Sequence, residues 1–492
     1  MFGKSLKYIT ILLLAFISTN VFSASVSADV PYSSYTYNFW LERVESPHPY
    51  VPESELNGTD LGVGNLNSPS DLFVTDKGDI YIVDTKNNRI VYFNENLEYI
   101  DEIKTFNNDS FNLPQGIYVT NDEHKYVADT ENKRLVEFDE ENNFVREIIP
   151  ETDLITDTTG FRPTKVSVDE AGRIYALAIG VNSGIVEINP DGSFQGFMGA
   201  SEVSINPFTY FWRRYLASDE QIKRMKSVIP TEYNNIFLDD NEFLYVTLGN
   251  IKVEDKGKDV VRRLNPTGKN ISRDFGYGKP IGDYFFSRND KVTKFSDVSV
   301  KKNQVYSVLD SENGKIFSYD YDGNLLYAFG TNGNKMGNFS NAVSLGQFND
   351  KLYVLDNIRN AIITFKLTTY GKAMNDALAF HYEGDYEKSY EKWEEVLKLN
   401  ANSDVAYIGL GKVLLRNQEY KQAMEYFKLA NMRDYYSKAF TNYRREVMND
   451  HFGTIMTSLL VLIFTLVIGL WIRKWNRLSR KVREDAVNEP LS

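Results

Sequence analysis

The sequence of 492 residues contains no cysteine, and this absence excludes several kinds of chemistry at once. Without thiols there is no disulfide, no thiolate zinc site and no cysteine nucleophile. Histidine is almost as scarce, with four residues that are far apart in the chain: His48, His124, His381 and His451. A histidine zinc site or a Ser-His-Asp triad needs converging partners, so neither is expected. The phosphate-binding loop, HExxH and GxSxG motifs are also missing.

A net positive charge is lacking too, because the formal charge of the chain is −12 at pH 7. Both ends of the chain are net basic, so the part between them is more acidic than the whole. Proteins that bind nucleic acids need basic surfaces that displace counterions from phosphates. Nucleic acid is therefore not an expected partner. No cofactor is expected either, since no motif that binds one is present.

Long hydrophobic runs occur only at the two ends of the chain. Near the N-terminus, two lysines precede the short apolar run 9–17, and the small residues at 26–28 suit a signal peptidase. These features are typical of a cleaved secretory signal peptide. The run is also shorter than the roughly 20 residues that span a bilayer. We predict that residues 1–28 are removed and that the mature chain starts at Asp29.

The second run, residues 453–472, contains no charged residue and has Trp471 near its end. A helix of this length is about 30 Å long, which matches the apolar core of a bilayer. Six Lys and Arg residues follow within the tail 473–492, and no such excess precedes the run. The positive-inside rule then places this tail in the cytoplasm and residues 29–452 outside. We predict a single-pass protein of the cell membrane, and the composition favours a bacterial surface protein.

A repeat of short β-type runs extends through residues 66–368. Its first copy has runs at 69–74, 78–84 and 87–93, and its second copy has the corresponding runs at 114–119, 125–129 and 132–138. Four weaker copies follow. Each copy, with a fourth run before the next one, describes an antiparallel four-stranded blade. Six copies predict a mainly β fold, a six-bladed β-propeller.

The repeat pattern is Tyr-Val-x-Asp-x-x-Asn-x-Arg-Ile after a Pro-x-Gly-like start, and it resembles the NHL-repeat family. The resemblance is close in copies one and two, fair in five and six, and degenerate in three and four. Asp84 and Asp129 end strands, where a carboxylate accepts backbone N–H bonds. Asn87 and Asn132 tolerate a left-handed turn. We interpret these residues as architectural and assign residues 29–368 to the propeller.

Closure of the ring needs one more strand, because the sixth copy stops after three. An open ring would expose strand edges, which proteins avoid. The strand-like segment 35–40 precedes the first copy, and we expect it to supply the outer strand of the last blade. A second irregularity, an insertion at about 200–229, separates copies three and four.

The insertion combines aromatic rings with arginine, as binding hot spots do. Its candidate partner-binding residues are Tyr210, Phe211, Trp212, Arg213 and Arg214. The alternative is that these rings only fix the insertion to its blade.

The hydrophobic period changes from about 2 to about 3.6 in residues 371–449, which indicates helices. Four residues recur 34 positions later: Ala377, Phe380, Tyr386 and Trp393 as Gly411, Leu414, Tyr420 and Phe427. This spacing resembles a tetratricopeptide repeat, in two copies followed by one further helix. By that resemblance the helices would bind a peptide or protein, or they would serve as a spacer above the membrane.

These elements favour a membrane-anchored extracytoplasmic binding scaffold and not an enzyme. The propeller would offer its exterior face to a protein or glycan ligand, and the helices would dock a membrane transporter. The domain order resembles that of accessory proteins beside carbohydrate import systems.

The alternative function is a metal-dependent hydrolase of the gluconolactonase type. Such six-bladed relatives hold a divalent metal in the central channel with carboxylate and Asn ligands. The resemblance implies a ring at the channel mouth made by the starts of the inner strands: Asp71, Glu232, Asp297 and Asn341. Lys165 falls in the same ring and would repel a cation. We therefore assign no metal ligand and no catalytic residue.

The predicted topology is tested by protease treatment of intact cells that carry epitope tags after residue 28 and at the C-terminus. The external tag should be lost and the C-terminal tag retained, because only residues 29–452 are exposed. Lysed cells, in which both tags are digested, are the control. Survival of the external tag on intact cells would contradict the orientation.

Overall fold

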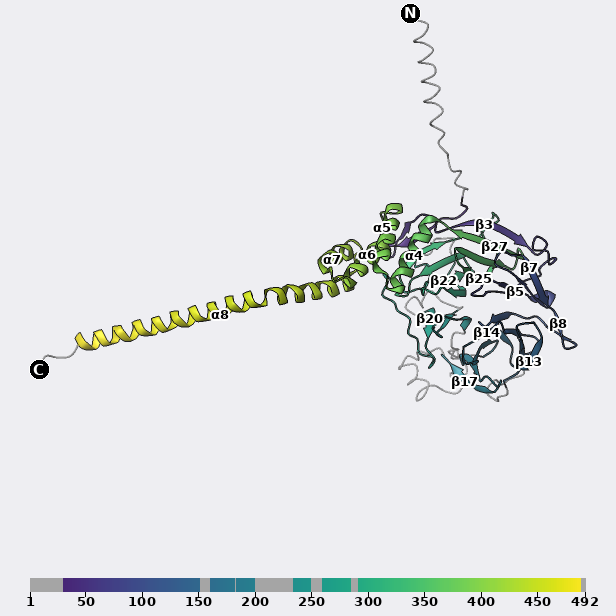
Figure 1. Ribbon diagram of the computed structural model, residues 1–492, viewed down its shortest axis with the longest axis horizontal. Coiled ribbons are helices and arrows are strands. Elements are labelled where there is room, and N and C mark those ends of the chain that lie inside the picture. Colours follow the sequence, from purple (N-terminus) through teal and green to yellow (C-terminus); the bar gives the residue numbers. More distant parts are fainter. Residues whose placement is uncertain are drawn as a thin grey trace, which may run out of the picture.

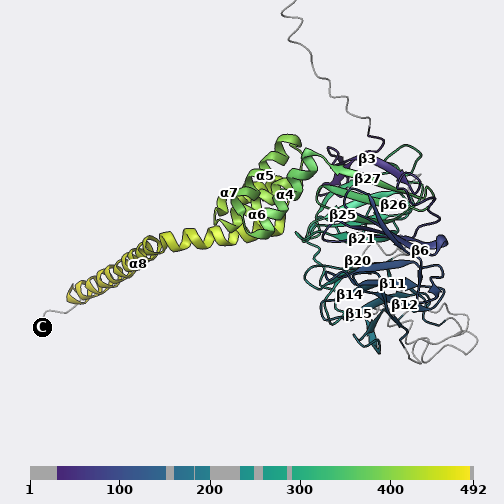
Figure 2. The same cartoon turned by 45° about the vertical axis from the view of Figure 1, so that its right-hand side comes forward.

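The computed structural model describes residues 30–150, 160–181, 183–199, 233–248, 259–284 and 291–487. Six antiparallel sheets form a ring, and helices follow at the C-terminal end (Figures 1 and 2). The expected six-bladed β-propeller followed by a helical segment is thereby confirmed. The predicted signal peptide and the insertion at about 200–229 lie outside the described residues.

The strands of the first three blades follow the chain from the channel outwards. Blade one contains β4 (Asp71–Val74), β5 (Ile80–Asp84), the short 3-10 helix η1 (Thr85–Asn87), β6 (Arg89–Phe93) and β7 (Tyr99–Ile103). A small hairpin follows, β8 (Thr105–Phe106) and β9 (Asp109–Ser110). Blade two contains β10 (Gly116–Val119), β11 (Lys125–Asp129), β12 (Arg134–Phe138) and β13 (Phe144–Ile148). Blade three contains β14 (Pro163–Val168), β15 (Ile174–Ala178), β16 (Ile185–Ile188) and β17 (Phe194–Met198).

The other three blades include strands from both ends of the propeller sequence. Blade four contains β18 (Tyr233–Leu238), β19 (Leu244–Leu248) and β20 (Val261–Leu264) in its described part. Blade five contains β21 (Phe295–Val300), β22 (Tyr306–Asp310), β23 (Lys315–Tyr319) and β24 (Leu325–Phe329), extended by β1 (Tyr35–Tyr37) and β2 (Arg43–Glu45). Blade six contains β25 (Ala342–Phe348), β26 (Lys351–Asp356), β27 (Ala361–Leu367) and β3 (Tyr50–Asn57).

The repeated aspartate organises the blades from within. The carboxylate of Asp84 accepts the backbone N–H of Asn67 at 2.7 Å, and it also receives Nε of Arg89 at 2.8 Å. In blade two, Asp129 accepts the N–H of Asn112 at 2.8 Å. Each carboxylate thus ties the second strand of its blade to the chain that leads into the first strand. These contacts support the architectural interpretation of the motif.

The strand that closes the ring differs from the expected one. β3 pairs with β27, with Glu55 opposite Ile363, and completes blade six. The segment 35–40 instead contributes β1 to blade five, where Tyr35 lies opposite Ala328 of β24. The expectation that 35–40 closes the last blade was therefore wrong, although the N-terminal chain does close it. The charged sequence 50–57 concealed the strand, because an outer edge strand faces solvent and needs few apolar residues.

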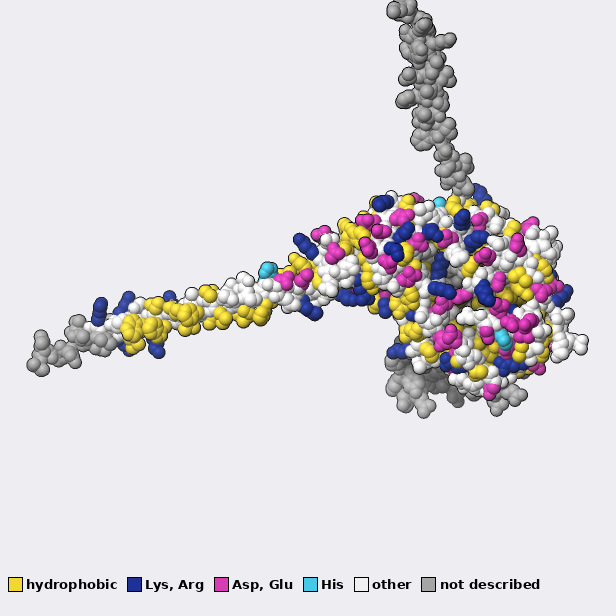
Figure 3. All heavy atoms as spheres, viewed as in Figure 1, with side chains coloured by type: hydrophobic (Ala, Val, Ile, Leu, Met, Phe, Trp, Pro, Cys, Tyr) yellow, Lys and Arg dark blue, Asp and Glu magenta, His cyan; other side chains and the backbone are white. Residues whose placement is uncertain are grey.

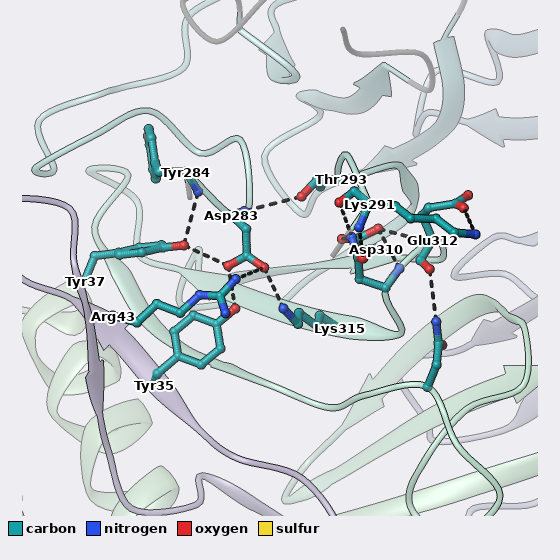
Figure 4. A network of polar contacts seen from close by, with 12 residues as sticks. Tyr35, Tyr37, Arg43, Asp283, Tyr284, Lys291, Thr293, Asp310, Glu312 and Lys315 are labelled. Atoms are coloured by element: carbon teal, nitrogen blue, oxygen red, sulfur yellow. Dashed lines mark hydrogen bonds and ion pairs between the residues drawn. The ribbon is translucent and has the colours of Figure 1, made fainter. Parts of the chain in front are cut away.

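β1 and β2 are held in place by one buried carboxylate, that of Asp283 (Figure 4). The hydroxyls of Tyr35 and Tyr37 donate to its Oδ1 at 2.5 and 2.7 Å. Arg43 and Lys315 approach its Oδ2 at 2.8 and 2.7 Å. Burial, and then the charge of Asp283, raise the pKa values of both tyrosines well above their ordinary range. The cluster joins β1, β2 and β23 to the loop that contains Asp283.

The helical segment contains α4 (Thr369–Glu383), α5 (Tyr386–Leu399), α6 (Asp404–Arg416), α7 (Tyr420–Leu429) and α8 (Arg433–Val487). The side chains of Thr368, Asp385 and Ser403 cap the N-termini of α4, α5 and α6, respectively, by accepting backbone N–H bonds. Figure 2 shows α4–α7 together on one side of the propeller, with α8 leading away from both.

The last helix of the segment 371–449 and the apolar run 453–472 form one continuous helix, α8. Hydrophobic side chains cover its middle part, with Lys and Arg near its far end (Figure 3). Among the described residues, α8 is the one helix that is long and apolar enough to cross a membrane.

The closing role of β3 predicts the effect of removing Tyr50. Its ring is 1% exposed and stacks on Phe329 with ring centres 5.2 Å apart. Tyr50→Ala should lower the free energy of unfolding by about 3–5 kcal/mol, the cost of a large buried aromatic. Tyr99→Ala, at a 46% exposed position on the outer strand of blade one, should cost far less. Thermal unfolding of both full-length variants measures this, and equal losses would contradict closure by β3.

Candidate functional site

The central channel is ringed by one residue from each inner strand. In each blade, the ring residue pairs with the second-strand residue just before the aspartate position of the repeat. For example, Asp71 pairs with Val83, and Asp297 pairs with Leu309. The same register gives the full ring: Asp71, Gly116, Lys165, Asn235, Asp297 and Ser344.

Two of the four predicted ring residues, Asp71 and Asp297, lie in this ring. Glu232 lies outside the described residues. Asn341 is not in the ring: it precedes β25, and its side chain donates to Asn357 at 2.8 Å. The ring position of blade six is Ser344, three residues after Asn341, and a β-bulge between Ala342 and Ser344 accounts for one of those residues. The sequence carried no visible signal of that bulge.

Three polar groups contact the carboxylate of Asp71. Lys165 forms an ion pair with its Oδ1, and the hydroxyl of Ser344, whose proton is shared with the closer Asp297, lies 3.2 Å from the same oxygen. The backbone N–H of Ile117 donates to Oδ2 at 3.1 Å. Burial lowers the pKa of Lys165, but Asp71 and Asp297 outweigh that effect and raise it, so this lysine is a cation at neutral pH.

Asp297 is buried and accepts four hydrogen bonds. Asn235 and the backbone N–H of Val298 donate to Oδ1, the latter at 2.8 Å. Ser344 Oγ and the backbone N–H of Leu345 donate to Oδ2 at 2.5 and 2.6 Å. Burial raises the pKa of Asp297 above its ordinary value of 3.8 to about 6, even though Lys165 favours the charged form.

The ring does not fit a divalent cation. Such an ion needs several free oxygen ligands, whereas the oxygens of Asp71 and Asp297 already accept bonds from protein donors. The ammonium of Lys165 also lies beside Asp71, where it would repel a metal ion. Nowhere in the described ranges do three or more His, Asp or Glu side chains gather as metal ligands would.

Above the ring, the channel opens into a cavity of about 630 Å³. Its walls come from the inner strands and from α4, which contributes Tyr382 and Glu383. Lys302 and Asp76 form an exposed ion pair on the rim at 2.7 Å. Lys301 also lines the cavity, and its burial lowers its pKa to about 8. The volume is within the range of small-molecule sites.

The participation of α4 in this cavity was not anticipated. Nothing in residues 371–383 distinguishes a helix over a channel from any other amphipathic helix. The predicted partner-binding cluster 210–214 lies outside the described residues, so it stays a prediction.

Comparison with known proteins supports the repeat. Residues 66–93 match the NHL repeat family model. No curated protein matches the chain.

Several solved structures are similar to this chain at low identity. Virginiamycin B lyase from Staphylococcus aureus is 12% identical, with 64% of this chain and 99% of that chain aligned at a TM-score of 0.39. A gluconolactonase from Xanthomonas campestris is 12% identical, with 69% and 96% aligned at 0.39. A protein of unknown function from Bacteroides thetaiotaomicron is 10% identical, with 68% and 76% aligned at 0.41. We draw no functional inference from similarities this distant.

The raised pKa of Asp297 predicts a pH dependence of stability. Since the folded state favours the protonated acid, the contribution of Asp297 is complete below about pH 4 and is lost as the pH rises through about 6. Asp297→Asn removes the titration and should flatten the stability profile by on the order of 2–3 kcal/mol between pH 4 and 7. Chemical unfolding across this range measures it.

The matched control is Asp76→Asn, which changes an exposed carboxylate on the rim of the same channel. This variant should keep the pH profile of the original protein. Asp310, whose pKa burial also raises to about 6, is present in all three proteins and cancels from the difference. Parallel profiles for the original protein and Asp297→Asn would contradict the assignment.

Proposed function

We propose that this protein is a membrane-anchored extracytoplasmic binding scaffold that presents the channel mouth of its propeller to a ligand. In this proposal residues 1–28 are the signal peptide, α8 crosses the membrane, and the basic tail is cytoplasmic. The helices α4–α7 are the predicted tetratricopeptide-like repeats. They hold the propeller and contribute one wall of the ligand site.

The observation that carries the proposal is the shared hydrophobic core of the propeller and the helices. Buried side chains of blades five and six continue without interruption into α4, α5 and α6, from Phe329 and Phe365 to Tyr370 and Trp393. This shared core is the joint between the propeller and the helices. It holds the propeller in a fixed orientation on the helices, because packed interiors deform little. That property suits a scaffold more than a freely jointed tether.

Polar contacts also fix the orientation of the helices on the propeller. Lys412 of α6 pairs with Asp322 of blade five at 2.7 Å. Although burial opposes it, Lys412, assisted by Arg273, lowers the pKa of Asp322 to about 2. The hydroxyl of Tyr277 is within hydrogen-bonding distance of the carbonyl of Ala430 and of Asp404, the latter at 3.2 Å, and its single proton is donated to one of them. These contacts favour one orientation of α6 and α7 on the propeller.

The hydrolase alternative has less support from the geometry. The buried carboxylates of the ring are engaged by Lys165, Ser344 and backbone donors, so neither is placed as a free base facing the cavity. The exposed rim, with Tyr382 and Glu383 from α4, suits contact with a larger partner. A component of a carbohydrate import system remains our proposed partner, and the cluster 210–214 a proposed second contact.

Photo-crosslinking in intact cells tests the ligand site. A benzophenone amino acid in place of Tyr382, beside the channel mouth, should capture a partner. The same label in place of Ile358, 66% exposed in the β26–β27 turn at the opposite end of blade six, should not. Adding Asp297→Asn to the Tyr382 label should leave the product intact, since a scaffold needs no ring acid. Equal capture at both positions would contradict the proposal.

A further inference from the structure

A second cavity, of about 720 Å³, lies between blade five and the helices. It is separate from the channel ring, although Asn303 and Tyr382 line both cavities where they meet. Its floor is the β23–β24 turn of blade five, and its walls come from α4–α8. The volume again matches that of a site for a compact ligand and not for a folded partner.

The charge of this cavity is opposite to that of the whole protein. Four cationic side chains line it, namely Arg273, Lys412, Arg416 and Lys438, against two carboxylates, Asp320 and Asp322. The carboxylates are already paired with Lys412 and Arg273. The excess positive charge therefore resides on Arg416 and Lys438, which are both exposed.

The lowered pKa of His381 is consistent with this positive charge. This histidine lines the cavity between α4 and the cationic side chains, and burial together with Lys412 and Arg416 lowers its pKa to about 4. Asp322, which also faces it, acts in the other direction but is outweighed. At neutral pH the imidazole is uncharged, so it can exchange hydrogen bonds with a ligand without adding a charge.

One wall of the cavity has an unpaired donor. Trp393 is 1% exposed and lines the cavity, and its indole N–H has no acceptor in the described part of the chain. A buried donor without a partner costs about 1–3 kcal/mol. The indole nitrogen packs against Gly409 and is closed off from the cavity, so only the rest of the ring belongs to the wall.

The remaining lining suits a sugar. Tyr382, Phe275 and Tyr386 provide ring faces, and the first two are more than half exposed. Neutral amides that both donate and accept, Asn303, Gln418 and Asn442, match hydroxyl groups.

We propose that this cavity binds a short acidic sugar, with its carboxylate at Arg416 and Lys438 and its ring against Tyr382. The site goes beyond the proposed role of the channel mouth and does not depend on it. Because α4 and α6 both contribute to the cavity and to the joint, a bound sugar would also bridge the propeller and the helices.

Calorimetric titration of the full-length protein in nanodiscs of neutral lipid tests this site with defined probes. Trigalacturonate should bind, and neutral galactotriose should bind at least tenfold more weakly. Arg416→Gln and Lys438→Gln should each weaken trigalacturonate about tenfold, the loss of roughly one charged hydrogen bond. Lys428→Gln, an exposed change on α7 outside the cavity, should leave the affinity unchanged.

Three results with the sugar probes would overturn the proposal. These are no binding of trigalacturonate, equal binding of the neutral sugar, and binding that both cavity variants leave unchanged. Triglutamate serves as the peptide probe, and tighter binding of it than of trigalacturonate would assign the cavity to an acidic peptide instead. Unfolding temperatures of the variants, which change exposed side chains, should match that of the original protein.

Discussion

Lys412 and Asp322 meet where the propeller and the helices join, and the arrangement of the two parts depends on this contact and the core around it. The apolar core supplies most of the favourable free energy, because it removes large side chains from water. The ion pair selects the orientation of α6 on blade five more than it stabilises the fold, since two charges must lose their hydration to form it. Each partner also has a second opposite charge nearby, Arg273 for Asp322 and Asp320 for Lys412, so the contact is part of a small network. The joint is therefore constrained to one geometry.

The N-terminal chain imposes a related constraint on the ring. It completes blade six with β3 and extends the four strands of blade five with β1 and β2. Asp283 gathers the hydroxyls of Tyr35 and Tyr37 and thereby couples the start of the chain to blade five (Figure 4). Blades five and six are also the blades that carry the helices. Ring closure and attachment of the helices thus occur in the same part of the molecule.

Much of the fold could be predicted, because local chemistry repeats along the chain. Asp84 and Asp129 mark equivalent strand ends, and the recurrence of the short β-type runs in six copies was enough to count blades. The channel ring was harder, because nothing in the sequence marks where the inner strand of blade six begins: its ring residue is Ser344, three positions after Asn341. The cavity beside Trp393 could not be predicted, because it depends on how α4–α8 pack against blade five. Such long-range packing leaves no local pattern.

The central claim, a propeller held rigidly on its helices, is tested most directly by distances between spin labels. The chain has no cysteine, so labels can be introduced at Ile358 of blade six and Met448 of α8 without background. In nanodiscs the account predicts a single distance distribution, about as narrow as that between Ile358 and Tyr99 within the propeller. A broad or multiple distribution for the first pair, beside a narrow one for the second, would contradict the rigid joint.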